Sequence, residues 1–278
     1  MSEAAAQIAA VWRLESAKII GALTRLGHDL AAAEDCAQDA LIAALEHWPL
    51  EGLPNQPGAW LMTTAKHKLL DRLRHAQVAQ REQAALGLDA DARDDAVSPD
   101  PLAILLADEA DDLGDDVLKL LFIACHPLLA RESQWALTLR LVCGLTVAEI
   151  ARATFTKEAT VAQRITRAKA QLEGHAFELP PAGERARRLG NVLTVLYLMF
   201  NEGYAASSGP EWMRPVLCHE ALRLARMLTA LCPAEAEVAA LHALMELQAS
   251  RLAARVDAQG APVLLMDQDR RRWDPLLL

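Results

Sequence analysis

Apolar residues recur every three or four positions along most of the chain, the spacing that places them on one face of an α-helix. Residues 8–82 contain three or four such amphipathic segments, separated at Gly27-His28-Asp29 and between Pro49 and Gly58. The same spacing predicts a second, smaller helical unit over residues 115–176 and a third helical stretch over residues 183–256. The pattern therefore predicts a protein built from several groups of helices.

The composition favours an all-α fold. Hydrophobic residues make up 53% of the 278 residues, enough for sizeable cores, whereas aromatic residues make up only 4%. Ala and Leu dominate, and the β-branched and aromatic residues that favour strands are few. At about 100–200 residues per domain, the length suggests two or three domains.

Several classes of protein are disfavoured by what the sequence lacks. No apolar run reaches the roughly 18 residues that a membrane span needs, and the N-terminus lacks the basic cluster of a secretory signal. The five cysteines are odd in number and widely spaced, without a CxxC pair. We therefore expect a cytoplasmic protein with reduced thiols, no membrane association, no metal site and no cofactor.

The formal net charge of −9 argues at first against a nucleic-acid partner. The charge is uneven, however, because eleven acidic residues and one basic residue lie between Asp89 and Asp116. This segment contributes −10, so the rest of the chain is close to neutral. Residues 83–114 also contain Ser98-Pro99-Asp100-Pro101, and we expect an acidic linker there with one helix over residues 101–110.

Residues 136–172 have the pattern of a helix-turn-helix motif. Thr146, with Glu149 three residues later, forms a capping box that begins one helix. After a tight turn, Thr156 is expected to cap the next helix, from Lys157 to about Gln171. Two helices joined by a short turn are typical of DNA-binding proteins.

The second helix of this motif has two distinct faces. At about 100° per residue, one face is apolar and is expected to pack inward: Val161, Ile165, Ala168 and Leu172. The other carries amide, hydroxyl and guanidinium groups that can contact base edges: Thr160, Gln163, Arg164, Arg167 and Gln171. Lys157 and Lys169 can reach phosphates. A solvated helix face has the same pattern, so the motif alone leaves both interpretations open.

Two helices of the first group have charged outer faces. Residues 31–48 predict an apolar stripe of Ala37, Leu41, Ala44 and Trp48, and an opposite side with Asp35, Gln38, Asp39 and Glu46. That side is either solvated or a docking surface for a basic helix.

Residues 57–75 predict a helix with an inner face of Leu61, Met62, Ala65, Leu69 and Leu73. Its outer stripe contains Thr64, His67, Lys68, Asp71, Arg74 and His75, flanked by Lys66 and Arg72. Such a stripe suits a phosphate backbone, and a solvated face explains it equally.

Together these segments resemble the extracytoplasmic-function branch of the sigma-70 family. The string AAAEDCAQDALIAAL is similar to the family's polymerase-docking helix, and PGAWLMTTAKHKLLDRLR to the helix that contacts the promoter's minus-10 element. The helix-turn-helix is similar to region 4, which reads the minus-35 element. The string VLYLMFNEGYAASSG resembles one subgroup with a helical extension after region 4. The resemblance covers roughly residues 8–274.

The resemblance implies region 2 over residues 8–82, the acidic linker over residues 83–114, region 4 over residues 115–176 and a helical extension over residues 180–278. Polymerase docking is implied for Glu34, Asp35, Gln38 and Asp39. Contacts to minus-10 DNA are implied for Lys66, His67, Lys68, Arg72 and Arg74, and contacts to minus-35 DNA for Lys157, Thr160, Gln163, Arg164 and Arg167.

The implied function is promoter-specific transcription initiation without enzymatic activity. The implied partners are core RNA polymerase and promoter DNA, and the extension is expected to contact a regulatory protein or the DNA-binding domains of the same chain. His67 stands where many relatives have Asn, and Phe155-Thr156-Lys157-Glu158 replaces a turn that usually contains Val-Pro. Relatives of the subgroup continue beyond Asp274, so the chain is either truncated or a naturally short form.

Two other classes of function remain open. One is a helix-turn-helix regulator that never joins polymerase, and the other is a helical enzyme with its chemistry in residues 190–256. Cys125-His126 lacks the accompanying base or ligands of a catalytic or metal site. In Asn201-Glu202-Gly203-Tyr204, Gly203 is expected to cap the C-terminus of a helix.

Overall fold

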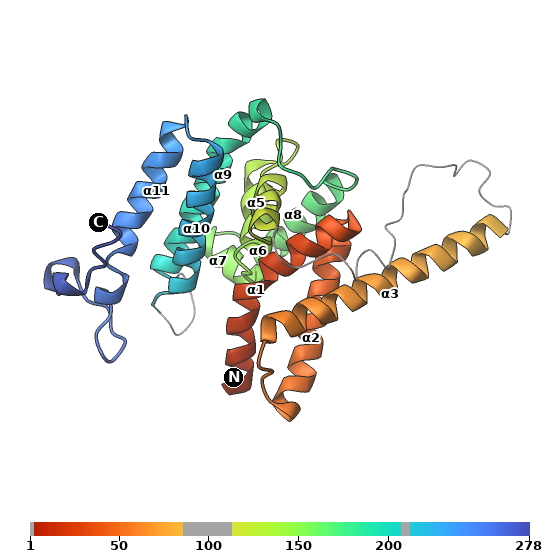
Figure 1. The fold of residues 1–278 in the computed structure, drawn as a ribbon, viewed down its shortest axis with the longest axis horizontal. Helices are drawn as coiled ribbons and strands as arrows, with labels where there is room; N and C mark the ends of the chain where they lie inside the picture. Colours follow the sequence, from red (N-terminus) through yellow and green to blue (C-terminus); the bar gives the residue numbers. More distant parts are fainter. Residues whose placement is uncertain (1–2, 86–112, 207–211) are drawn as a thin grey trace. The chain divides into compact units, whose positions relative to one another are not determined.

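The computed structural model describes residues 3–85, 113–206 and 212–278 (Figure 1). The described residues form α-helices and three short 3-10 turns, with no β-strand among them, which confirms the all-α prediction. They divide into two compact units: the first contains the chain up to Ile123 together with Lys169–Glu178, and the second contains Ala124–Ala168 and Leu179–Leu278. The helix expected over residues 101–110 lies outside the described residues.

Three long helices pack against one another in the first unit: α1 (Glu3–Gly27), α2 (Leu30–Glu51) and α3 (Pro57–Ala85). The breaks between them fall where the sequence predicts. At the first break His28 has a φ of 54°, and the Asp29 carboxylate caps α2 by accepting from the backbone N–H groups of Ala31 at 2.8 Å and Ala32 at 3.0 Å. Because α2 is an alanine-rich helix, its neighbours approach closely, and its buried alanines include Ala33, Ala37, Ala40 and Ala44.

The start of α5 (Leu113–Ala124) belongs to the same unit and carries a completely buried carboxylate, Asp116. Arg25 on α1 donates from Nε to Asp116 Oδ2 at 2.8 Å. A Cβ atom at Gly21 would lie 3.1 Å from the Asp116 carbonyl oxygen, so the glycine permits the close approach of α1 and α5. The pairing compensates for the desolvation of the buried charge.

The second unit contains the predicted helix-turn-helix and the extension. Its helices are α6 (Arg131–Leu141), α7 (Val147–Ala153), α8 (Glu158–Gln171, up to Ala168 in this unit), α9 (Ala182–Tyr204), α10 (Pro215–Leu231) and α11 (Ala236–Ala249). Figure 1 shows α9, α10 and α11 side by side, with α10 packed on both of the others. α9 also contacts α6, so the extension and the helix-turn-helix region share one folded body.

The expected role of Gly203 as a helix cap is wrong. Gly203 lies in the last turn of α9, and the cap residue is Ala205. A Cβ atom at Gly203 would lie 2.7 Å from the backbone N and 2.8 Å from Sγ of Cys218 on α10. The glycine is required here because α9 and α10 approach too closely for any side chain, and a local helix signal cannot reveal such a contact.

None of the described helices is both long and apolar enough to cross a lipid bilayer.

Gly203→Ala is expected to lower the thermal midpoint of unfolding, because the new methyl group meets backbone atoms that cannot move alone. Overpacking typically costs about 1–3 kcal/mol, which exceeds the roughly 0.5–1 kcal/mol that replacing a helical glycine by alanine contributes. Gly190→Ala on the same helix is the matched control, since open space surrounds Gly190 and this variant should be stabilised. Circular dichroism melting of both variants measures the difference, and equal midpoints would contradict the close contact.

Candidate functional site

The predicted docking residues on α2 differ in their exposure to solvent. Asp35 and Asp39 are exposed and Gln38 is half-buried. The Gln38 amide donates to Glu34 Oε1 at 2.7 Å, so these two side chains form a pair along the helix. Three of the four predicted residues therefore reach solvent.

Glu34 differs from the other three because only 3% of its surface is exposed. Its Oε2 lies 2.9 Å from Nζ of Lys169, in the Lys169–Glu178 segment of the same unit. Lys169 was predicted to reach phosphates, whereas in this structure its ammonium group pairs with a carboxylate. At about 100° per residue, Glu34 lies roughly 20° from Leu41 of the predicted apolar stripe, so its spacing already indicates burial.

The same face of α2 continues into two exposed apolar side chains, Ile42 and Leu45. At about 100° per residue, Ile42 lies roughly 20° from Asp35, and Leu45 lies roughly 20° from Gln38. The surface is therefore acidic at one end and apolar at the other. This angle could have identified both residues from the sequence, and the prediction missed them.

The basic stripe of α3 is exposed except at Lys66. His67, Lys68, Arg72 and Arg74 face solvent, whereas Lys66 is only 9% exposed and has interactions of its own. Lys66 therefore lies apart from the basic row with which it was predicted. Arg72 Nη1 lies 3.2 Å from Asp35 Oδ2 on α2, and both side chains are about half exposed. Such an exposed pair contributes little to stability, so Arg72 can exchange it for a phosphate.

The capping box that begins α7 is confirmed. The Thr146 hydroxyl oxygen accepts from the Glu149 backbone N–H at 3.2 Å, and Glu149 Oε2 accepts from the Thr146 backbone N–H at 2.9 Å. The predicted cap at Thr156 is wrong, because its hydroxyl donates to the Thr154 carbonyl oxygen at 3.0 Å, and α8 begins at Glu158. Phe155 forms the turn with a φ of 51°, a conformation that non-glycine residues rarely adopt.

The division of α8 into two faces is confirmed by burial. Its apolar residues are buried as predicted: Val161, Ile165, Ala168 and Leu172. Gln163, Arg167 and Lys157 are exposed, and Thr160 and Arg164 are half-buried at the edge. The predicted hydrogen-bonding groups thus lie together along one accessible side of the helix.

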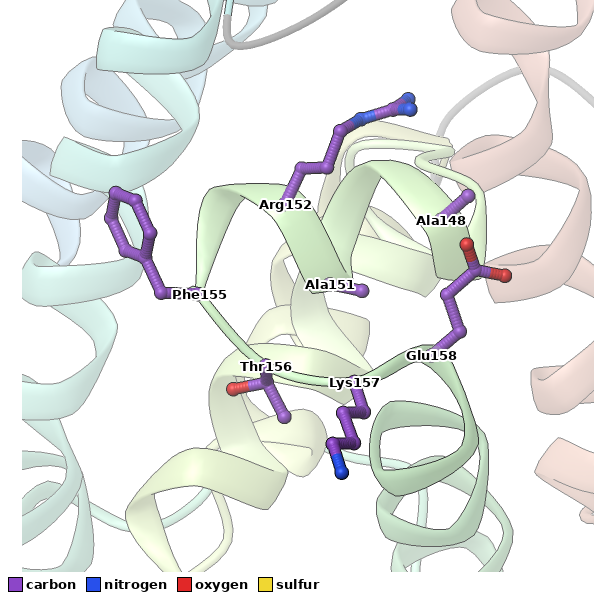
Figure 2. Close-up of a pocket in the computed structure, with 7 residues that line it drawn as sticks. All are labelled: Ala148, Ala151, Arg152, Phe155, Thr156, Lys157 and Glu158. Carbon is purple, nitrogen blue, oxygen red and sulfur yellow. The ribbon is translucent and has the colours of Figure 1, made fainter.

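The turn between α7 and α8 forms an open hollow of about 700 Å³ (Figure 2). Phe155, 99% exposed, points to one side of it, whereas Ala148 and Glu158 lie together on the other. Arg152 and Lys157 point in opposite directions, which places cations on both sides of the turn. Small-molecule sites are usually enclosed clefts, so this open surface is better suited to a macromolecule.

A buried ion cluster joins the helix-turn-helix to the extension. Arg214, directly before α10, places Nη2 2.7 Å from Oε1 of Glu149 on α7 and Nη1 3.2 Å from Oε1 of Glu202 on α9. All three residues are buried. Glu149 and Arg214 are 65 positions apart in the chain, and no pattern in the sequence predicts their contact.

The environment of Glu149 favours its charged form. Burial raises the pKa of this carboxyl, but hydrogen bonds from Thr146 and the neighbouring Arg214 guanidinium outweigh burial and hold the pKa below its usual 4.5. A carboxyl whose pKa is lowered by folding stabilises the fold above its unfolded pKa. This contribution is lost as the pH falls through the lowered pKa.

The thiols have the character of core residues. All five cysteines are free, and Cys36, Cys125, Cys143 and Cys218 are buried. Burial raises the pKa of both Cys125 and Cys218 to about 12, which disfavours the reactive thiolate. Within the described residues, no group of three or more His, Cys, Asp or Glu side chains could hold a metal ion.

Comparisons with known families match three successive parts of the chain. Residues 13–78 match sigma-70 region 2, residues 119–172 match sigma-70 region 4, and residues 188–278 match DUF6596, a family of unknown function. The chain is 44% identical over 265 residues to an uncharacterized protein of Rhizobium meliloti (strain 1021), and the alignment covers 91% of this chain but 59% of that relative.

No solved structure matches the chain. The matches follow one another in the order region 2, region 4 and DUF6596. The region 4 match contains both the capped helix α7 and α8 with its buried apolar face. Together, these three matches are those of an extracytoplasmic-function-like sigma factor of the sigma-70 family with a C-terminal extension.

Proposed function

We propose that this protein is an alternative sigma factor that binds core RNA polymerase and directs initiation at a specific set of promoters. The single observation that carries the proposal furthest is the division of α8, where a buried apolar face leaves Gln163 and Arg167 accessible opposite it. Sigma-factor families are not enzymes, and we propose no catalytic activity. The protein would act in the cytoplasm, where polymerase and promoter DNA are present.

The accessible side of α8 has the chemistry that reading base pairs requires. An arginine can donate two hydrogen bonds to a guanine edge, and a glutamine can pair with an adenine edge in the major groove. Gln163, Arg164 and Arg167 supply these groups, with Thr160 beside them. Lys157 at the start of α8 would contact a phosphate and fix the register of the helix.

The basic row of α3 is proposed to engage the minus-10 region. His67, Lys68, Arg72 and Arg74 are the exposed members, and they suit a phosphate backbone. Lys66 is left out of this contact because its side chain is buried. Arg74 lies 3.7 Å from Asp71, an exposed and weak pair that leaves its guanidinium available.

The outer face of α2 is proposed to dock on polymerase. Asp35 and Asp39 would attract basic side chains of the partner, and Ile42 with Leu45 would bury apolar surface beside them. Electrostatic complementarity sets orientation and association rate, whereas buried apolar area contributes affinity. A partner helix with basic and apolar residues on one face satisfies both requirements.

Arg167→Ala is expected to weaken binding to minus-35 DNA about 10- to 100-fold, because each specific arginine–base contact contributes about 1–3 kcal/mol. The measurement is fluorescence anisotropy of holoenzyme, reconstituted with core polymerase, on duplexes that the unaltered protein selects from a randomised pool. Arg187→Ala is the control, since Arg187 is an exposed arginine of the extension, on α9. Equal losses for the two variants would mean that α8 makes no specific contact.

Asp39→Lys is expected to reduce the affinity for core RNA polymerase at least about tenfold, because like charges in an interface can cost several kcal/mol. Glu235→Lys changes the net charge equally at an exposed position of the extension and should bind as the unaltered protein does. Surface plasmon resonance on immobilised core enzyme compares them. Unaltered polymerase binding by Asp39→Lys would show that this face of α2 is not the docking surface. No polymerase binding by the unaltered protein, with DNA binding intact, would instead favour a helix-turn-helix regulator that acts without joining polymerase.

A further inference from the structure

The buried contact between the extension and the helix-turn-helix is a charge cluster with specific geometry. One guanidinium faces two carboxylates, with Arg214 Nη2 2.7 Å from Glu149 and Nη1 3.2 Å from Glu202. The side chains are only 6% to 10% exposed. Charges removed from water in this way are tolerated only when their partners remain in place. The cluster therefore restricts the relative positions of the segments that contribute to it.

Glu149 has a second task besides pairing with Arg214. Its Oε2 accepts hydrogen bonds from both the backbone N–H and the hydroxyl of Thr146, at 2.9 Å each, while its Oε1 faces Arg214. The Glu149 carboxylate thus takes part in the N-terminal cap of α7 and also binds this end of the helix to the extension. A displacement of Arg214 would be transmitted directly to the start of α7.

The extension holds Arg214 firmly in turn. The Arg214 backbone N–H donates to the Gly203 carbonyl oxygen at 2.7 Å, and α9 and α10 approach closely at this glycine. Glu202 is the residue before Gly203, so α9 orients both the backbone and the guanidinium of Arg214. Two residues of the Asn201-Glu202-Gly203-Tyr204 string, Glu202 and Gly203, thus hold the Arg214 side chain and backbone in place.

The path from α7 to the proposed reading helix is short. The Thr156 backbone N–H donates to the Ala151 carbonyl oxygen at 2.8 Å, which ties the turn back onto α7. α8 begins two residues later, at Glu158. The position of α7 therefore limits where the exposed side chains of α8 can lie.

We propose that Arg214 is a positioning residue for DNA recognition, which acts through Glu149 to hold α7 and the start of α8 in the reading geometry. The DUF6596 region is then a supporting part of the DNA-reading unit. This gives a specific role to the expected contact between the extension and the DNA-binding domains of the same chain. The proposal rests on the proposed function insofar as α8 reads DNA, whereas the ordering of α7 by Arg214 can be tested without DNA.

The first test is hydrogen–deuterium exchange of the full chain. Arg214→Gln removes the shared countercharge while keeping a polar side chain, and amides of α7 and the following turn are expected to exchange at least about tenfold faster. Arg223→Gln is the matched control, because Arg223 pairs with Glu220 within α10 at 2.6 Å and should leave α7 protected. Unchanged protection of α7 in Arg214→Gln would overturn the proposal.

The second test measures DNA discrimination in the reconstituted holoenzyme. Arg214→Gln is expected to bind duplexes selected by the unaltered protein at least about tenfold more weakly. Binding to a random-sequence duplex should change less than about twofold, because the buried Arg214 contacts no phosphate. A uniform loss on both duplexes would indicate general unfolding and contradict a positioning role. If the unaltered protein selects no duplex, the proposed DNA reading fails, and the exchange experiment still decides the role of Arg214.

Two further variants keep the proposal falsifiable if Arg214→Gln does not fold. Arg214→Lys retains the charge but lacks the planar fork that faces both carboxylates, so protection of α7 should be intermediate. Glu149→Gln and Arg214→Lys combined should lose little more than either variant alone, because both interrupt one contact. Fully additive effects on α7 exchange would show that Arg214 does not act through Glu149.

Discussion

The position of the helix-turn-helix depends on one buried guanidinium. Arg214 lies between the carboxylates of Glu149 and Glu202, away from water. Desolvating three charged groups is costly, and their attraction offsets the cost only while the geometry is complete. If α7 and α9 moved slightly apart, Glu149 or Glu202 would remain buried without its countercharge. The cluster therefore penalises small displacements of these helices more sharply than apolar packing does. The arrangement is thus a device for specifying geometry as much as for adding stability.

Helix length explains why the motif needs such support. α7 has only seven residues, and isolated helices shorter than about 12–15 residues are marginal in water. Its capping box satisfies two backbone groups at the N-terminus, but a helix of about two turns buries little apolar surface of its own. α6 contacts α9 of the extension, and the ion cluster adds a second connection at the start of α7. The short helix is therefore ordered mainly by what it packs against.

The sequence predicts what depends on neighbouring residues and misses what depends on tertiary contacts. The capping box of Thr146 and Glu149 and the two faces of α8 follow from spacing alone, and both are present. Glu34 and Lys66 were grouped with exposed contact residues, yet both are buried. At about 100° per residue, they lie roughly 20° from Leu41 and Leu73 of the apolar faces, so periodicity indicates their burial. Their partners, such as Lys169 for Glu34, depend on the tertiary fold. Arg214 illustrates the same limit, since it is 65 positions away from Glu149 and lies outside any regular pattern.

The charge distribution adds a reason why geometry matters in this protein. With a net charge of −9, which the −10 of the segment between Asp89 and Asp116 accounts for, the chain has little long-range attraction for DNA. Charges farther apart than about 8 Å are largely screened at physiological ionic strength, so Arg164 and Arg167 act only near contact. Hydrogen bonds tolerate only about 0.5 Å of variation in length. A strongly basic protein compensates for loose placement by non-specific attraction to phosphates, whereas an acidic one depends on the contacts that hold its proposed reading helix in place.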